Sequence, residues 1–517
     1  MAAVQATESA RNRRAELLCA AGASLLVGAA IIVAGDMPRA VQGTIIGALL
    51  GAAILAAARN RTLTLAVLWV LLHPLSIEKI FLFGTPLLPS FIPPSIIISA
   101  SDMALLALFA VMICRALFTA DRPFTWPSIA TPFAALALWT ALMAIRVPST
   151  QAALATVQLL KMLLFIVVFS SAVTTRRELA ILLCAMAVAI GMQSLLVLRS
   201  YFTGQAVSFA SAVSGSPLSF SGAAGEQIIR AIGTVGHVNQ QASFHAFFTL
   251  PLLGLFALPR RWLSTAVFGI IALSLASILV TYSRTAWLAM AVGGIAVAVT
   301  AWRTGRIQGY NWFYLGLAMI FVLSICAANY RPIMDRMVTG DEGATESRSR
   351  AVDLALDLAA AYPVAGVGPG NFVAESLQLY PYDRLGTVWL KKNELSQIRR
   401  FGRVEINEVY DQRTNTTYVI PLAVHNKFLL ILAELGGVGL AIFLWFQLSV
   451  FTCLSRGLRT CSGSYLWAGI GIMGAFCATQ VYMFFDLFAD DKPMAILLFT
   501  AILAVCFERT ASGEARS

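Results

Sequence analysis

Charged side chains are scarce in this sequence of 517 residues. They make up 12% of the chain, against roughly 25% in ordinary soluble domains. Hydrophobic residues make up 58% of the chain, and mean hydropathy is +0.78. Many apolar runs approach the length of about 20 residues that a helix needs to cross a bilayer. A soluble globular fold is therefore excluded, and the sequence predicts an all-α integral membrane protein.

The cysteine spacing of a metal site or a disulfide framework is also missing. The chain has eight cysteines, but no two are separated by just two residues, and none falls within 330–424. We therefore predict no disulfide framework, no metal site and no cofactor. All of the cysteines lie in or beside apolar runs: Cys19, Cys114, Cys184, Cys326, Cys453, Cys461, Cys477 and Cys506.

The apolar runs predict about fourteen membrane spans, within a range of twelve to fourteen. The third is the least regular, because Pro74, Glu78 and Lys79 interrupt it. The predicted spans are 16–35, 41–58, 62–83, 95–118, 128–146, 151–173, 179–201, 237–257, 263–281, 284–302, 311–329, 425–450, 464–485 and 493–508.

Arginine and lysine alternate between the two sides of these spans. With the N-terminus in the cytoplasm, the inner loops and tails hold seventeen of them and the short outer loops five. Cytoplasmic loops are enriched in these residues. We therefore predict cytoplasmic tails at 1–15 and 509–517, and a bacterial inner membrane location. The same loops account for much of the net charge of +11, so no nucleic-acid partner is expected.

One long polar segment, 330–424, separates the predicted membrane helices 16–329 from those of 425–508. The predicted topology places it outside, on the periplasmic face, together with a shorter Ser-, Gly- and Ala-rich segment at 202–236. Ala and Leu predict a helix over Glu346–Ala361, which Pro363 and the following glycines end. The predicted architecture is therefore a helical membrane domain with one large, partly helical periplasmic loop.

His425 and Arg284 stand where two spans begin at the predicted outer face. An imidazole at this boundary can exchange protons with water and can act as a base. A guanidinium beside a helix N-terminus is suited to a diphosphate. The structural alternatives are a histidine that only caps its helix and an arginine that reaches lipid headgroups.

Other polar residues near the same face are weaker candidates. Arg348 and Arg350 lie two positions apart on one predicted helix, so at most one faces a shared site. The glycines of 366–370 either approach a phosphate or only form a turn. Four residues are candidates for lining a cavity, namely His237, Asn239, Asn426 and the mid-span Lys161. Glu434 is a further intramembrane charge, while Asp486, Asp490 and Asp491 favour a solvated loop over a metal site.

Several of these segments, in this order, resemble the O-antigen ligase superfamily. They are Ser283-Arg284-Thr285-Ala286, Ser347-Arg348 ahead of Pro363–Phe372, and His425–Leu429 followed by Glu434-Leu435-Gly436 and Gly439. The Gly233–Asn239 segment resembles a pattern found among members. The superfamily includes O-antigen ligases, O-antigen and exopolysaccharide polymerases, and protein O-oligosaccharyltransferases.

The resemblance implies a glycosyltransferase that uses an undecaprenyl-diphosphate-linked glycan as donor and a glycan, lipid or protein hydroxyl as acceptor. It implies that His425 is the base and that Arg284 and Arg348, or Arg350 in place of Arg348, bind the diphosphate. We expect transfer to invert the anomeric centre and to need no metal. The sequence departs from the commoner pattern by a long insert between Phe372 and His425.

Two other functions remain open at this stage. A polymerase would use the same donor and the same residues with a growing glycan as acceptor. A polysaccharide or lipid transporter would place charges at the bilayer midplane and carry internal repeats. The sequence shows no such repeat, and its informative charges gather at one face, so surface chemistry is the favoured interpretation.

Overall fold

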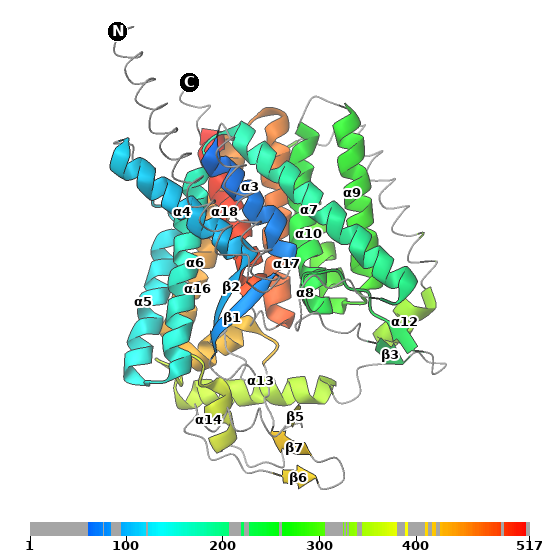
Figure 1. Cartoon of the computed structure of the whole chain (residues 1–517). Helices are drawn as coiled ribbons and strands as arrows, with labels where there is room; N and C mark the ends of the chain where they lie inside the picture. Colours follow the sequence, from blue (N-terminus) through cyan, green and yellow to red (C-terminus); the bar gives the residue numbers. More distant parts are fainter. Residues whose placement is uncertain are drawn as a thin grey trace, which may run out of the picture.

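The computed structural model (Figure 1) shows a bundle of helices with one helix, α13, lying across one end. The residues that it describes are 60–75, 77–83, 95–119, 123–205, 219–221, 227–257, 261–305, 324, 327, 330–338, 344–379, 388–390, 409–411, 416–419, 424–486 and 491–512.

Helices make up most of the described chain. They are α3 (Arg61–Leu72), α4 (Ala100–Phe118), α5 (Ala130–Arg146), α6 (Thr150–Ala172), α7 (Arg176–Thr203), α8 (Val238–Thr249), α9 (Arg261–Val280), α10 (Arg284–Arg303), α12 (Tyr330–Val338), α13 (Ala344–Ala361), α14 (Phe372–Leu379), α16 (Lys427–Thr460), α17 (Leu466–Phe485) and α18 (Asp491–Ser512), with short 3-10 helices η2 (His73–Leu75), η3 (Leu250–Ala257) and η5 (Gly463–Tyr465).

Eight helices in the described parts of the chain are long and apolar enough to cross a membrane. They fall on predicted spans: α6, for example, runs over 150–172 where the sequence predicts 151–173. The predicted spans 16–35 and 41–58, and most of 311–329, lie outside the described residues. The chain is a multi-pass membrane protein.

The described residues are mostly helical, as the all-α prediction expects, but they also include three small antiparallel sheets that the sequence did not predict. β1 (Glu78–Phe83) pairs with β2 (Ser95–Ser99), and β3 (Ser219–Ser221) pairs with β4 (Gln227–Ile229). In the third sheet β7 (Thr416–Val419) lies between β5 (Val388–Leu390) and β6 (Val409–Asp411). This third sheet lies within the predicted insert, where the residues follow no regular hydrophobic period.

The predicted third span, 62–83, is wrong in its second half. α3 ends at Leu72 and the chain continues as β1, while β2 takes the first residues of the predicted fourth span. Pro74 lacks a backbone N–H and so disfavours continuation of α3. Since the 12 residues of α3 rise only about 18 Å, the β1–β2 hairpin starts where α3 stops, partway along the bundle (Figure 1).

The predicted eighth span, 237–257, is also not one regular helix. α8 ends at Thr249, and η3 continues the chain. Pro251 removes a helical N–H there, and α17 packs closely against the altered turn. A Cβ on Gly471 would lie 2.3 Å from the Leu250 carbonyl oxygen, so only glycine allows this approach.

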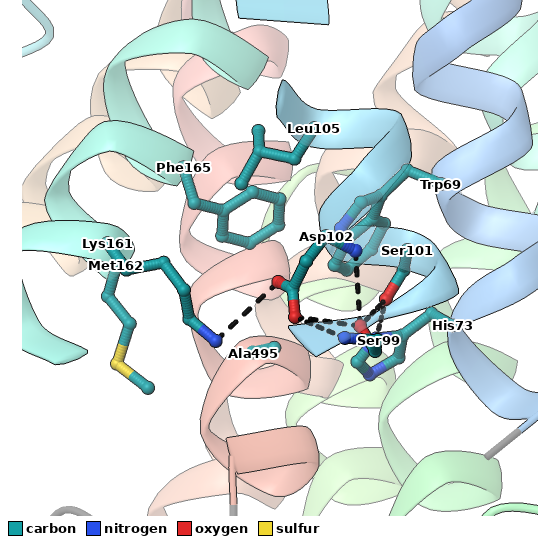
Figure 2. A pocket seen from close by; sticks show the side chains of 10 residues that line it. All are labelled: Trp69, His73, Ser99, Ser101, Asp102, Leu105, Lys161, Met162, Phe165 and Ala495. Carbon is teal, nitrogen blue, oxygen red and sulfur yellow. Dashed lines mark hydrogen bonds and ion pairs between the residues drawn. The ribbon is translucent and has the colours of Figure 1, made fainter. Parts of the chain in front are cut away.

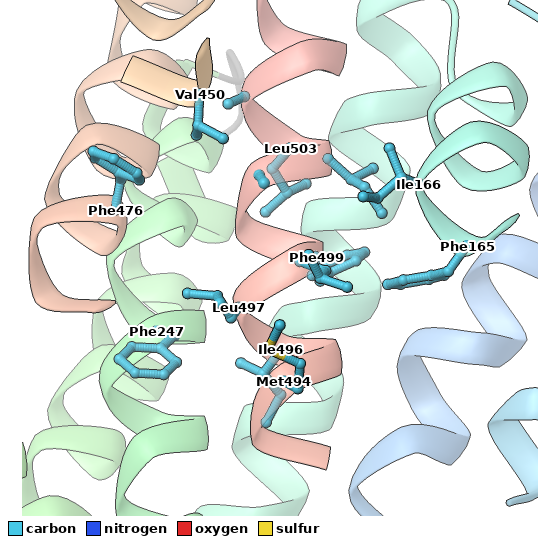
Figure 3. Packing of buried hydrophobic residues seen from close by; sticks show 14 of the residues in the cluster. Phe165, Ile166, Phe247, Val450, Phe476, Met494, Ile496, Leu497, Phe499 and Leu503 are labelled. Atoms are coloured by element: carbon cyan, nitrogen blue, oxygen red, sulfur yellow. The ribbon is translucent and has the colours of Figure 1, made fainter. Parts of the chain in front are cut away.

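The core of the bundle lies around α17 and α18. In the most apolar window of α18, 83% of the residues are buried, against 22% for α10 at the periphery. Side chains of α18 such as Phe499 and Leu503 fill the space toward α6 (Figure 3). The Phe499 ring lies 5.2 Å from Trp69 and 5.4 Å from Phe169. Because lipid is as apolar as these side chains, close packing rather than water exclusion holds the helices together.

The two ends of the bundle differ in chemistry. At one end, which we call the basic end, Arg176 donates to the Thr510 carbonyl at 3.2 Å and Arg456 pairs with Glu508 at 3.6 Å. At the opposite end, which we call the loop end, α10 and α16 begin and α13 lies across the bundle (Figure 1). The predicted catalytic and diphosphate-binding residues all belong to elements of the loop end.

Candidate functional site

His425 stands directly before α16, at the loop end. The next residue, Asn426, is the N-cap of this helix, and its side chain accepts a hydrogen bond from the Leu429 amide at 3.0 Å. Asn426 is therefore a buried capping residue, and capping side chains of this kind fix the entry of the chain into the helix. The predicted role of Asn426 in lining a cavity stays a prediction beside this capping contact.

The imidazole of His425 faces a carboxylate from another helix. Its Nδ1 atom lies 3.6 Å from Oδ1 of Asp486, the residue that follows α17. Both side chains retain contact with solvent, with exposed fractions of 33% and 18%. At this separation the contact is between charges and is not a hydrogen bond. It places the carboxylate beside Nδ1 and leaves the other ring nitrogen, Nε2, as the candidate base.

Arg230 lies on the other side of the same region and is 8% exposed. Its Nε atom donates to the Thr281 carbonyl at 2.9 Å, and a terminal nitrogen donates to Oδ1 of Asn239 at 2.9 Å. The Tyr482 hydroxyl donates to the Asn239 carbonyl at 2.6 Å. Asn239, predicted to line a cavity, therefore joins Arg230 to α17.

His237 completes this group as the N-cap of α8. Its Nδ1 atom accepts a hydrogen bond from the Asn239 amide at 3.3 Å. The charged groups of Arg230, His425 and Asp486 all act on the His237 ring. We call the residues that interact here the loop-end cluster: Arg230, His237, Asn239, His425, Tyr482 and Asp486.

Arg284 is joined to the loop-end cluster through the turn before it. It is the first residue of α10 and is half-buried. The preceding Ser283 is hydrogen-bonded to Tyr482 of the cluster, and the Thr281 carbonyl accepts from Arg230. The free N–H groups of the first helical turn carry partial positive charge. The arrangement thus provides a guanidinium and a helix N-terminus beside the cluster.

The other predicted diphosphate ligands belong to α13. Arg348 is exposed on this helix, which lies across the loop end (Figure 1). The side chain of Arg350 lies outside the described residues. The choice between the two as a ligand therefore stays a prediction that depends on the resemblance.

The glycine segment predicted as a turn is one, and it also docks onto α16. The predicted helix over 346–361 is confirmed as α13, which ends at Ala361. Amides of the following turn donate across to α16, from Val367 to the Ala433 carbonyl and from Gly368 to the Glu434 carbonyl, both at 2.9 Å. In return, Gly437 donates to the Pro363 carbonyl at 2.8 Å.

α16 accepts this segment because its own helix is broken. Gly436 has φ 69° and ψ −172° inside the helix, a conformation that only glycine adopts readily. The Leu435 carbonyl accepts from the Trp139 indole at 2.9 Å. The interruption lies about three helical turns beyond His425. Two motifs that are separate in sequence, 363–372 and 434–439, therefore form one structural unit.

Lys161 does line a pocket, but the residues around it are not those of the loop-end cluster. Its ammonium nitrogen lies 3.6 Å from Oδ1 of Asp102, between α4 and α6 (Figure 2). Oδ2 of Asp102 accepts from the Ser99 amide and hydroxyl, both at 2.9 Å. His73 shares a 3.3 Å hydrogen bond with Ser101 in the same pocket. The pair lets a bilayer-spanning helix hold a lysine, since a lone charge is expensive there.

Replacement of Lys161 by methionine is expected to destabilise the protein by about 1–3 kcal/mol, because Asp102 loses its counter-charge in a low-dielectric setting. The double variant Lys161→Met/Asp102→Asn should be more stable than Lys161→Met alone. Asparagine keeps an oxygen for the Ser99 amide without carrying a charge. Thermal unfolding in detergent measures both, and losses that simply add would contradict the pairing.

Sequence reasoning did not consider Arg230 or Tyr482, and it missed the contact between Asp486 and His425. Arg230 is one of only two charged residues in the 202–236 segment, the other being Glu226, and this isolation was a usable signal. Asp486 was read as part of a solvated acidic loop, because its partner His425 belongs to a different helix. Among the described residues, no group of three or more His, Cys, Asp or Glu side chains is placed to hold a metal ion.

The arrangement can support proton transfer next to a bound anion. His425 and Asp486 offer an oriented base that water and substrate can reach. Arg284 and the start of α10 offer positive charge for an anionic leaving group. The family model described as O-antigen ligase matches residues 269–444, which contain α10, α13, His425 and the break in α16. A search of curated proteins found no match to the chain.

Proposed function

We propose, from the match of residues 269–444 to the O-antigen ligase family model, that the chain acts as a member of the O-antigen ligase superfamily. It transfers a glycan from an undecaprenyl-diphosphate carrier to an acceptor hydroxyl. The observation that carries the proposal is the His425–Asp486 pair, which the Arg230–Asn239–Tyr482 contacts connect to the start of α10. A base and an anion-binding helix end at one membrane surface suit this chemistry.

The proposed reaction is a single displacement at the anomeric carbon of the donor. His425 takes the proton of the acceptor hydroxyl as its oxygen forms the new glycosidic bond. The bond between the anomeric carbon and the diphosphate oxygen breaks, and undecaprenyl diphosphate leaves with the electron pair. Attack opposite the leaving group inverts the configuration. Arg284, the first turn of α10 and an arginine of α13 stabilise the developing charge on the diphosphate.

The location of the reaction is part of the proposal. We place the loop end at the periplasmic face of the bacterial inner membrane and the basic end in the cytoplasm, following the arginine distribution. The polyprenyl chain of the donor stays in lipid, so the protein must bind the diphosphate at the membrane surface. Residues 330–424 then form the periplasmic segment between membrane domains 16–329 and 425–508, and its poorly patterned middle, 373–418, faces the acceptor.

The direct test is an in vitro transfer assay with purified protein and a labelled undecaprenyl-diphosphate glycan. Candidate acceptors are a lipid-linked core glycan, a growing glycan and a protein. A single addition identifies a ligase, and a ladder of products identifies a polymerase. Turnover should persist in excess chelator, because arginines supply the positive charge. If no acceptor received the glycan, the proposed reaction would be contradicted. Complete loss of transfer in chelator would contradict its metal independence.

Replacement of Asp486 by asparagine is expected to lower transfer by about tenfold or more, because the imidazole loses the carboxylate that orients it. The double variant with His425→Ala should be no slower than His425→Ala alone, since the two residues act as one unit. Asp353→Asn, at an exposed carboxylate of α13, is the matched control. A further rate loss in the double variant would show that Asp486 acts independently of His425.

A further inference from the structure

The turn that leads into α10 has an unusual backbone. Tyr282 has φ 51° and is the one non-glycine residue with positive φ in the part of the chain that the structure describes. Its side chain is 1% exposed. An aromatic residue in this conformation costs about 1–3 kcal/mol and persists only where its surroundings enforce it. Arg284 follows two residues later. The turn therefore determines the position and direction from which the Arg284 side chain extends.

Arg230 holds one side of this turn. Its Nε atom donates to the Thr281 carbonyl at 2.9 Å, and the amide of the next residue, Ala231, donates to the Val280 carbonyl at 3.2 Å. The 230–231 segment therefore binds two consecutive carbonyls at the end of α9. These are carbonyls that a helix end leaves without an intrahelical partner.

Tyr482 and Asn239 hold the other side. Ser283 is hydrogen-bonded to the Tyr482 hydroxyl, which donates to the Asn239 carbonyl at 2.6 Å. The Asn239 side chain accepts from Arg230 at 2.9 Å. The contacts thus form a closed ring that runs from the turn through α17 and the start of α8 back to Arg230.

We propose that Arg230 is a positioning residue that clamps the 281–283 turn and so directs Arg284 toward the donor diphosphate. The inference rests on the proposed function, because it assumes that Arg284 binds the diphosphate of the donor. Arg230 is buried with two of its donors engaged by protein oxygens, whereas Arg284 is half-buried at a helix N-terminus. The two arginines therefore have different roles, one structural to the turn and one in contact with substrate.

The geometry also indicates why this position carries arginine. A guanidinium presents several N–H groups in a fixed plane, so that Nε and a terminal nitrogen reach two acceptors at once. A lysine ammonium keeps the charge but has no such fork. Arg230→Lys is thus a charge-preserving variant that removes the clamp.

The test is a double-mutant cycle on the binding of undecaprenyl diphosphate to the full-length protein, measured by native mass spectrometry in detergent. Arg230→Lys should weaken binding by about tenfold, the equivalent of one charge-assisted interaction. In an Arg284→Ala background the same change should alter binding by less than about twofold, because the guanidinium group that Arg230 positions is then absent. Arg456→Lys at the basic end is the matched control and should bind as the wild type does.

The possible outcomes distinguish a failure of the positioning role of Arg230 from a failure of the proposed donor. An equal loss of binding in both backgrounds would overturn the clamp and assign Arg230 an independent role. Absence of wild-type binding would overturn the donor and, with it, the role given to Arg230. Should Arg230→Lys fail to fold, Asn239→Ala carries the cycle, since it removes one acceptor of the same fork. It should then weaken binding in the wild-type background alone.

Discussion

Replacement of His425 by alanine is expected to reduce glycan transfer by about 10²–10⁴-fold, the usual contribution of a general base. The His425 imidazole is accessible to solvent and lies at ion-pair distance from a carboxylate. Its ring is 33% exposed, so truncation leaves no buried cavity. The transfer assay measures the rate, and a thermal unfolding midpoint measures whether the protein remains folded.

A second variant separates proton transfer from shape. His425→Gln keeps a polar side chain of similar reach but cannot take up a proton, so it should be as slow as His425→Ala. Both proteins should remain membrane-inserted and unfold near the wild-type temperature. If His425→Gln retained more than about a third of wild-type turnover, His425 would not be the base, whatever its position.

Replacement of Gly436 by alanine is expected to destabilise the protein on the order of 3–5 kcal/mol, at the severe end of single substitutions. The residue has φ 69°, and a Cβ atom there would lie 2.2 Å from the Val364 carbonyl oxygen. Neither atom can move away cheaply, because the oxygen belongs to the backbone and the Cβ position is fixed by the backbone of residue 436. The expected result is separation of the 363–370 segment from α16, followed by loss of transfer.

A glycine in an open place provides the control for this prediction. Gly294 lies within α10, and a Cβ there would meet nothing within 4 Å. Gly294→Ala should therefore unfold at or above the wild-type temperature, since alanine favours helix. Thermal unfolding in detergent and transfer activity are the measurements. Near-equal behaviour of the two variants would show that docking of 363–370 into the broken helix is dispensable.

Much of the bundle was predictable, because a long apolar run in a membrane must satisfy its backbone hydrogen bonds internally and therefore forms a helix. The same physics explains the failures. The helix α3 is followed by a hairpin near Pro74, Glu78 and Lys79. These residues predict the interruption of the span, but they do not predict which structure follows it. The 3-10 segment after Thr249 depends on close contact with α17, which is a tertiary feature that no local pattern carries.

The candidate site shows the same division. His425 and Arg284 were predictable because each stands at the start of an apolar run in a motif that resembles a known family. Arg230 was not predicted, and Asp486 was predicted only as part of a solvated loop. In both cases the contacts that matter are with residues of other segments. Likewise, the glycines of 366–370 predicted a turn from local chemistry. Their docking against Gly436 depends on residues far along the chain.

The central claim is that the loop end, with His425, Asp486 and Arg284, is where the lipid-diphosphate donor is bound and cleaved. Photocrosslinking tests it most directly, with an undecaprenyl-diphosphate glycan that carries a photoreactive group on the sugar next to the diphosphate. The account predicts labelled peptides from 230–239, 281–287 and 425–434. Labelling confined to the basic end around Arg176 and Arg456, or to the pocket of Lys161, would contradict it.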